Sequence, residues 1–421
     1  MFLMTPSFRS HMDRRYHTTI LNIVTSSLSL RFLKGQPEYF KKKGYEFVVV
    51  SSPGEELQEA QRAGIRSVAV SMAREISFWK DFVSTLQLIR MILRLRPAIT
   101  NVGTPKAGLL GGLAACLCQV PCRYYSLLGL RCETTTGFKR RLLLITERIA
   151  CACAHRVICV SESLRQKAIE LGILSADKTV VLGAGSYTGV DPERFTPTAE
   201  AIGRARRIRQ GMGIPEEAPV VGFVGRLTKD KGISELVEAY LALRADIPKL
   251  TLLLVGELEE GDPLPPQIRR QIECERGIFH TGFVKDPSDY YHVMDVFAFP
   301  SHREGFGTVA LEANAACKPI VAARATGAVD AVIDGVTGIL VPVGDARVLA
   351  SALARVIGDR RLASELGSAG RERVLRDFRQ EIIWEALEQE YSQMLSGKGL
   401  TVPNAEGAGA GAFSTTVAIP Q

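Results

Sequence analysis

The sequence predicts an α/β protein of two domains, each built around a doubly wound parallel sheet. Short apolar runs alternate with longer segments of helical periodicity almost from end to end. Glycines and prolines interrupt this alternation over residues 183–219, and it then starts again. The 421 residues, 46% apolar and 23% charged, suffice for two ordinary cores and exclude disorder or a fibre as a description of the whole chain.

The apolar runs are typical of buried parallel strands. The first series lies at residues 18–25, 46–51, 67–71, 98–102 and 156–160. Between two of these runs, residues 78–95 have helical spacing. The second series lies at residues 220–224, 249–255, 278–283, 296–300 and 319–322. Apolar residues recur every three to four positions over residues 233–244, which predicts a helix packed on the second sheet.

These patterns divide the chain into five parts. We expect a loose leader over residues 1–17, an N-terminal domain over 18–190 and a C-terminal domain over 191–378. A helix over residues 379–396 is expected to cross back to the N-terminal domain. The remaining residues, 397–421, are rich in glycine, alanine, threonine and proline without periodicity, which predicts a disordered tail.

Charge is unevenly distributed between the two halves. Residues 1–190 hold 26 lysines and arginines against 13 acids, whereas residues 191–421 hold 26 against 32. The excess in the first half indicates an anionic partner, whether nucleic acid, phospholipid or a phosphorylated substrate. Aromatic residues among the cations are too few to favour nucleic acid.

The spacing of the cysteines predicts no metal site, and the length of the apolar runs predicts no membrane-spanning helix. Nine cysteines, an odd number in mostly apolar surroundings, favour free thiols in a reducing cytosol. Their Cys-x-Cys steps lack the spacing of structural zinc, so no metal site is predicted. No run reaches the 18 or so apolar residues that a membrane-spanning helix needs.

A glycine-rich segment at residues 179–189 could be mistaken for a dinucleotide-binding loop. Such a loop must open a helix whose N-terminus holds the pyrophosphate. Pro192 and Pro197 interrupt the chain where that helix would run. We therefore interpret the segment as a hinge between the domains and disfavour a dehydrogenase.

The segment 220–232 is a candidate anion site. An apolar strand precedes Gly225, and Arg226 and Lys231 follow before a helix begins near Ile233. Glycine lets a phosphate approach the backbone, and the two cations can neutralise a diphosphate. The alternative interpretation is an ordinary strand-to-helix turn with solvated cations.

A second candidate loop follows the predicted strand 296–300. Glu304 and Glu312 flank a glycine-rich turn, and a helix that starts near Gly307 would contain Glu312 and leave Glu304 in the loop before it. Carboxylates can accept hydrogen bonds from sugar hydroxyls, and N–H groups at the helix start favour an anion. Two surface glutamates beside a turn are the alternative.

In order along the chain, these two loops and the segments 325–330 and 334–342 resemble the donor domain of family 4 retaining glycosyltransferases. The similarity covers roughly residues 18–395 and implies the GT-B fold, in which two doubly wound domains face each other across a cleft. Residues 31–36, 103–108 and 133–137 are similar to enzymes that extend lipid-diphosphate-linked sugars for capsule, O-antigen or exopolysaccharide.

This resemblance implies a role for each motif residue. Arg226 and Lys231 would hold the donor diphosphate, Glu304 the hydroxyls of the transferred sugar and Glu312 the ribose. The further donor-binding residues implied are Gly225, Gly305, Phe306, Gly307 and Thr308. Transfer of a hexose or N-acetylhexosamine, most simply from a UDP-sugar, would proceed with retention and without metal or cofactor.

The chain departs from the family pattern at one place. Many relatives carry a histidine before a glycine in the first domain, but residues 125–129, which end in Gly129, contain none. A backbone group could replace the histidine, the donor could be held differently, or activity could be reduced.

The basic first half is expected to bind the acceptor, a polyprenyl-diphosphate-linked saccharide. Its candidate residues follow predicted strands, where their loops could meet at one sheet edge, although scattered surface charge is the alternative for any one of them. They are Arg31, Lys34, Lys106, Arg131 and Glu133. Basic and apolar residues mixed at 40–43, 79–94 and 139–141 favour peripheral attachment to the inner face of the cell membrane, although helices packed on a sheet look alike.

Three classes of function remain. A glycosyltransferase fits the motifs best. A nucleotide-sugar epimerase or a phosphorylase would use the same fold, and so would a non-catalytic partner subunit, which the missing histidine keeps in view.

Overall fold

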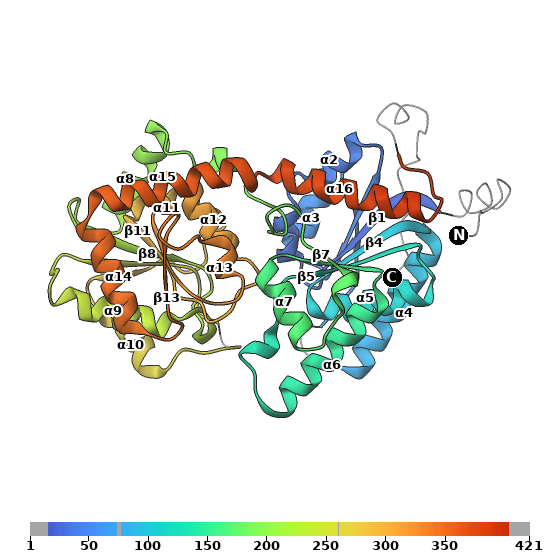
Figure 1. Ribbon diagram of the computed structural model, residues 1–421, viewed down its shortest axis with the longest axis horizontal. Helices are drawn as coiled ribbons and strands as arrows, with labels where there is room; N and C mark the ends of the chain where they lie inside the picture. Colours follow the sequence, from blue (N-terminus) through green and yellow to red (C-terminus); the bar gives the residue numbers. More distant parts are fainter. Residues whose placement is uncertain (1–15, 74–76, 260, 404–421) are drawn as a thin grey trace. The chain divides into compact units, whose positions relative to one another are not determined.

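The computed structural model of the protein describes residues 16–73, 77–259 and 261–403, which form two compact units (Figure 1). Of the described residues, the first unit contains those up to Ser126, Ile145–Ile158 and those from Trp384 to 403. The second unit contains Leu127–Leu144 and Cys159–Ile383. Neither unit is therefore a continuous stretch of sequence. Most of the predicted leader and of the predicted tail lies outside the described residues.

The first sheet has seven strands in the order β3-β2-β1-β4-β5-β6-β7. Its strands are β1 (His17–Ile23), β2 (Glu46–Ser51), β3 (Arg66–Ala69), β4 (Pro97–Gly103), β5 (Cys122–Leu127), β6 (Arg156–Cys159) and β7 (Thr179–Val180). The pairings from β3 to β5 are parallel. Because the strand order reverses between β1 and β4, the loops after these two strands flank the switch point where such sheets bind ligands.

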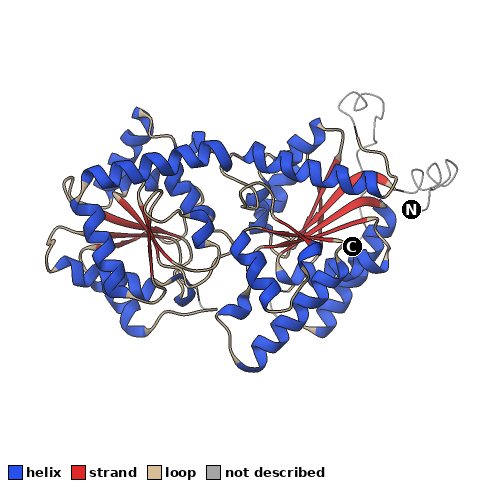
Figure 2. Ribbon diagram, in the orientation of Figure 1, coloured by secondary structure: helices blue, strands red, loops and turns tan. Residues whose placement is uncertain are grey.

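Helices follow most strands of this sheet along the chain, and they lie around it (Figure 2). They are α2 (Gln36–Lys42), α3 (Glu55–Arg62), α4 (Phe78–Leu95), α5 (Pro105–Leu117), α6 (Gly137–Cys153) and α7 (Glu162–Glu170). The bounds predicted for α4 and β2 are confirmed. Strand β5 was not predicted because Arg123, Tyr124 and Tyr125 break the apolar run, yet both tyrosine rings are fully buried.

The last helix, α16 (Gln380–Gly397), completes the core of the first unit. Tyr391 is 1% exposed, and its ring lies 4.9 Å from that of Tyr124 and 5.7 Å from that of Phe40. The side-chain amide of Asn101 donates a 2.8 Å hydrogen bond to the Tyr391 hydroxyl. Residues more than 260 positions apart in sequence thus share one core.

The second sheet has six parallel strands in the order β10-β9-β8-β11-β12-β13. They are β8 (Val220–Val224), β9 (Thr251–Val255), β10 (Ile278–His280), β11 (Val296–Phe299), β12 (Ile320–Ala323) and β13 (Ile339–Val341). Its switch point lies between β8 and β11. These bounds confirm the predicted second series to within three residues at each end, but β13, only three residues long, was not predicted.

The helices of the second unit cover this sheet. They are α8 (Ala199–Gly211), α9 (Ile233–Arg244), α10 (Pro266–Cys274), α11 (Ser288–Val293), α12 (Thr308–Ala315), α13 (Ala328–Ala331), α14 (Ala346–Gly358) and α15 (Arg360–Asp377). The predicted stripe of α9 is fully buried at Ile233, Leu236, Val237 and Tyr240. In the described parts of the chain, no helix combines the length and apolarity needed to cross a membrane.

Candidate active site

Two loops meet at the switch point of the second sheet. One runs from Gly225, after β8, to Gly232, where α9 begins, and the other follows β11. Gly232 has a φ of 70°, and a Cβ placed there would lie 2.1 Å from the carbonyl oxygen of Pro300. Only glycine permits this approach, so the glycine joins the two predicted motifs in space.

Three consecutive residues of the second loop pair with charged residues near the start of α9. The pairs are His302 with Glu235 at 2.8 Å, Arg303 with Asp230 at 2.7 Å and Glu304 with Lys231 at 2.5 Å. All six side chains are between 12% and 23% exposed. Ion pairs this shielded from water hold the two loops in a fixed register.

The first pair also changes how its members titrate. The hydrogen bond with Glu235 raises the pKa of His302 above its ordinary value, although burial opposes the change. Burial alone would raise the pKa of Glu235, but the bond with His302 lowers it. Both shifts favour the charged pair.

Cations converge on Asp230. Burial alone would raise the pKa of Asp230, but a hydrogen bond from Thr228 and the charges of Arg303, Lys231 and Arg226 together lower it. Arg226 is half exposed and pairs with Glu259. Because the Arg226 side chain is 49% exposed, a phosphate can reach it from solvent, whereas the Glu259 side chain is only 18% exposed.

The loop after β11 turns through a tightly packed glycine corner. A Cβ at Gly305 would lie 2.0 Å from the carbonyl oxygen of Leu128. Gly307, with a φ of 92°, begins α12, and a Cβ there would lie 2.5 Å from the ring of Phe299. Phe306 between them is 4% exposed, so only its backbone can face a ligand. The predicted helix start near Gly307 is confirmed.

Glu312 lies in α12, away from the ion pairs. The hydroxyl of Tyr291 donates a 2.6 Å hydrogen bond to it. Burial raises the pKa of Glu312 to about 7. The structure thus brings Lys231 and Glu304 into contact and Arg226 to the same cluster, whereas Glu312 contacts a tyrosine. Its role toward a ribose stays a prediction.

Residues that the sequence did not single out support the corner from the other side. The Ser161 hydroxyl donates to the Gly305 carbonyl at 2.7 Å. Asp330 accepts the backbone N–H groups of Glu162 and Ser163 at 3.1 and 3.3 Å, in the first turn of α7, whose N-cap is Ser161. Asp330 lies within a segment that carries the family resemblance, but its partner lies 168 positions away and no spacing reveals it.

Leu128 and Gly129, from the segment in which many relatives carry a histidine, also contact the glycine corner around Gly305. The Leu128 carbonyl occupies the space that any side chain at Gly305 would need, and Gly129 has a φ of 141°. A Cβ at Gly129 would lie 3.5 Å from the backbone nitrogen of Gly305. The backbone of Leu128 and Gly129 therefore packs directly against the loop that follows β11.

Of the residues predicted to bind the acceptor, Glu133 and Arg131 belong to the second unit. Glu133 accepts a 2.7 Å hydrogen bond from Thr326, and burial raises its pKa. Its other carboxylate oxygen is buried without a hydrogen-bond partner in the described structure. Arg131 is exposed. Thr134, one residue beyond Glu133, accepts a hydrogen bond from Arg303 at 2.9 Å.

The other predicted acceptor residues lie in the first unit, next to its own switch point. The hydroxyls of Thr25 and Thr104, on the loops after β1 and β4, are 2.7 Å apart. Arg31 pairs with Glu56 at 2.7 Å, and Lys106 pairs with Asp81 at 2.8 Å. Lys34 is exposed. Two of the three cations are thus matched by carboxylates, and a diphosphate would have to compete with these partners.

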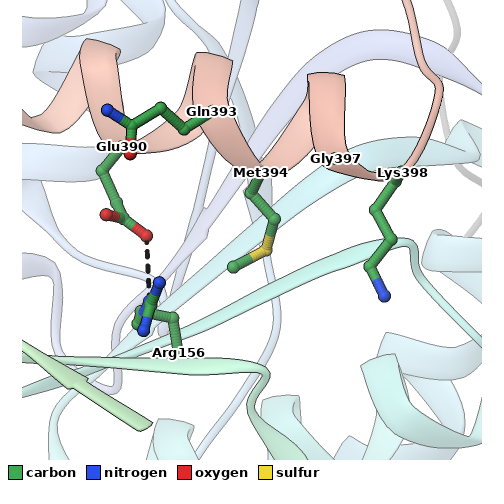
Figure 3. A pocket seen from close by; sticks show the side chains of 6 residues that line it. All are labelled: Arg156, Glu390, Gln393, Met394, Gly397 and Lys398. Atoms are coloured by element: carbon green, nitrogen blue, oxygen red, sulfur yellow. Dashed lines mark hydrogen bonds and ion pairs between the residues drawn. The ribbon is translucent and has the colours of Figure 1, made fainter. Parts of the chain in front are cut away.

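Two further observations concern possible metal ligands and a cavity. In the described residues, no group of three histidine, cysteine, aspartate or glutamate side chains could hold a metal ion. A cavity of about 250 Å³ lies beside the end of α16 (Figure 3), but Arg156 and Glu390 in its wall already pair with each other at 3.2 Å. None of the predicted site residues lines it.

A cluster of cations and carboxylates beside a glycine corner, at the switch point of a doubly wound unit, is the arrangement of a glycosyltransferase with the GT-B fold. Residues 205–373 match the family described as "Glycosyl transferases group 1", and residues 36–185 match the "Glycosyl transferase 4-like domain". The chain therefore belongs to the family 4 glycosyltransferases, as its motifs predicted.

Relatives along most of the chain agree with this assignment. The capsular polysaccharide biosynthesis glycosyltransferase CapM of Staphylococcus aureus is 37% identical over 376 residues, 89% of this chain and 97% of CapM. The UDP-Gal:alpha-D-GlcNAc-diphosphoundecaprenol alpha-1,3-galactosyltransferase of Escherichia coli is 27% identical, over 69% of this chain and 74% of its own. The protein is thus a glycosyltransferase.

Solved structures share the fold. Anabaena HepE in complex with UDP-glucose superposes with a TM-score of 0.74 over 90% of this chain and 99% of HepE, at 23% identity. The sucrose-phosphate synthase of Thermosynechococcus elongatus, also 23% identical, has a TM-score of 0.71 over 90% of this chain and 99% of its own.

Proposed function

We propose that this glycosyltransferase moves a sugar from a nucleotide diphosphate sugar, with UDP as the nucleotide, to a lipid-diphosphate-linked saccharide during synthesis of a surface polysaccharide. The E. coli relative acts on a UDP-sugar and a diphosphoundecaprenol acceptor by its name, and HepE binds UDP-glucose. We further propose that transfer retains the anomeric configuration and needs no metal.

The pair of Lys231 and Glu304 carries this proposal. Lys231, with Arg226 nearby, supplies positive charge where a departing diphosphate would accumulate negative charge. Glu304 fixes the Lys231 ammonium at 2.5 Å and keeps oxygen lone pairs for sugar hydroxyls. Backbone N–H groups at the start of α12 add the positive end of a helix dipole.

The contacts of Glu304 and Asp230 favour retention of the anomeric configuration without a covalent glycosyl-enzyme intermediate. A covalent route in retaining hydrolases uses a second carboxyl about 5 Å from the first. Glu304 is bound to Lys231, and Asp230 is bound to Thr228 and Arg303, so neither carboxylate is placed as a free nucleophile. In the proposed front-face reaction, the acceptor hydroxyl attacks as the bond to the diphosphate breaks, and the departing phosphate oxygen takes its proton.

For the acceptor, we propose that cations beside the first switch point hold its diphosphate. Arg31 and Lys106 would exchange their carboxylate partners for phosphate, and exposed Lys34 would add a third charge. Arg131 and Glu133, which belong to the second unit, stay proposed acceptor-binding residues. We also propose peripheral attachment of the enzyme to the inner face of the cell membrane, where a lipid-linked acceptor would lie.

Donor identity is tested by thermal unfolding with a panel of nucleotide sugars. A ligand at a hundred times its Kd adds about 2.7 kcal/mol to the free energy of unfolding, so the donor should give a larger shift than UDP alone. Failure of every UDP-sugar, with a shift from another nucleotide sugar, would replace UDP in the proposal.

Transfer is tested with that donor, a polyprenyl-diphosphate saccharide and EDTA. Retained α configuration from an α-linked donor, read by NMR of the product, is the expected result. Arg226→Ala should abolish transfer, whereas the matched control Arg361→Ala, which removes another exposed, paired arginine, should not. Sugar conversion without acceptor, or phosphorolysis with orthophosphate, would instead indicate an epimerase or a phosphorylase.

A further inference from the structure

Helix α4 exposes an unusual number of large apolar side chains. Phe78 is 88% exposed, Trp79 82%, Phe82 58% and Val83 50%. The opposite face of the same helix is buried in the first unit through Leu88, Met91 and Ile92. Packing on the sheet therefore accounts for one apolar face of α4 and leaves the other facing solvent.

The charge on this outer face is positive. Lys80, Arg90 and Arg94 are exposed, and Arg90 follows Trp79, Val83 and Leu86 along one side of the helix at successive turns. The acid of the helix, Asp81, is paired with Lys106 at 2.8 Å. Apolar rings followed by exposed cations are complementary to an anionic phospholipid surface, where rings enter the interface and cations meet headgroups.

The aromatic end of α4 lies near the acceptor loops of the same unit. Asp81, two residues after Trp79, pairs with Lys106, which follows β4 at the switch point. Helices α4 and α5 pack side by side (Figure 1). A surface that holds Trp79 at a membrane therefore brings Lys106 toward the depth of lipid headgroups, where the diphosphate of a lipid-linked acceptor lies.

We infer that the outer face of α4 is the membrane-docking surface of this enzyme and that it binds anionic phospholipid. This inference rests on the proposed function, because a lipid-linked acceptor is what gives membrane docking a purpose. Its test measures binding to vesicles and does not depend on that acceptor. Of the other two segments predicted to meet the membrane, residues 40–43 do not form such a surface, because Phe40 is fully buried in the first unit, whereas residues 139–141 follow the 80% exposed Phe138 and stay a prediction.

Intrinsic fluorescence reports docking directly. The chain has two tryptophans, and Trp384 is 7% exposed, so a change in emission on adding vesicles comes from Trp79. Vesicles of phosphatidylcholine with about 30 mol % phosphatidylglycerol, which carry a negative surface potential, should shift the emission to the blue and co-sediment the protein. Pure phosphatidylcholine should bind far less, and added salt should weaken binding.

Two variants separate the apolar and the basic contributions. Trp79→Ser with Phe82→Ser should abolish co-sedimentation, whereas Phe283→Ser, a 54% exposed phenylalanine of the second unit, should leave it unchanged. Arg90→Glu with Arg94→Glu should weaken binding to anionic vesicles by roughly fivefold or more per cation removed. Circular dichroism and thermal unfolding confirm that each variant is folded.

Other outcomes would overturn the inference. It fails if the wild type does not bind anionic vesicles at low salt, or if the variant lacking Trp79 and Phe82 binds as well as the wild type. It also fails if sedimentation shows a wild-type dimer that this variant loses, since a second copy would then cover the face. Turnover of a short-chain, water-soluble acceptor tests the proposed function separately, because the α4 variants should retain it.

Discussion

The ion pair of Lys231 and Glu304 allows its structural and catalytic roles to be measured separately. The variants are Lys231→Met, Glu304→Gln and the two combined. Breaking a fully buried pair costs about 3–5 kcal/mol, and an exposed pair contributes about 0–1 kcal/mol. With side chains 19% and 12% exposed, the pair lies between these limits, so each single variant should lose about 2 kcal/mol of unfolding free energy.

The double variant leaves no uncompensated charge and should be more stable than the sum of the single effects predicts. We expect a coupling energy of about 1–2 kcal/mol in this cycle. Since 1 kcal/mol lowers the Tm of a domain of this size by about 2–4 °C, each single variant should melt about 4–8 °C lower, with some recovery in the double variant.

Activity should not recover with stability. Loss of one group that stabilises developing charge lowers kcat by about 10²–10³, and the double variant lacks both groups. The assay is transfer from the donor found by thermal shift, at temperatures where all four proteins are folded. If the double variant regained transfer to within about tenfold of wild type, the pair would be structural and the catalytic assignment wrong.

Three further predictions concern single residues. Gly305→Ala should lower both the Tm and the donor affinity, because the new Cβ would lie 2.0 Å from the carbonyl oxygen of Leu128. Gly358→Ala, with open space around its Cβ, should lower neither. Thermal unfolding with and without donor measures both quantities. Asp330→Ala should cost about 1 kcal/mol in urea unfolding, because the N–H groups of Glu162 and Ser163 in the first turn of α7 lose their acceptor while the N-cap Ser161 remains; no loss would show that this acceptor contributes nothing. Burial raises the pKa of Glu147 to about 7, from 4.5, so its contribution to stability is present below pH 4.5 and lost as pH rises through 7. Glu147→Gln should therefore flatten the fall in unfolding free energy between about pH 5 and 8, and an equally steep fall in this variant would assign the loss to other groups.

Elements with a strong periodic pattern could be predicted from sequence almost to the residue. Helices α4 and α9 and strands β2 and β8 have the expected bounds. Strand β5 could not be predicted, because its buried tyrosines depend on distant partners: the Tyr124 hydroxyl donates to the carbonyl of Glu390, 266 positions away. Local patterns carry no information on such tertiary contacts.

In the candidate site, too, single residues could be predicted from the sequence, but the contacts between them could not. Strand-end loops with glycine and charge predicted Lys231 and Glu304, and the structure joins them. The pairing of Arg303 with Asp230 was not predicted, because which neighbours of a motif meet depends on the register of two loops 73 positions apart. Glu312 was correctly placed in a helix, but its contact with Tyr291 requires the fold.

The position of Tyr391 has a consequence for synthesis of the protein. Proteins emerge from the ribosome N-terminus first, and domains generally fold as units as they emerge. Here the side chain that packs on Phe40, Asn101 and Tyr124 is translated at least 267 residues after them. Part of the interior of the first unit must therefore stay uncovered until α16 has been translated. A premature stop codon before Trp384 would leave it incomplete and a substrate for chaperones or proteases.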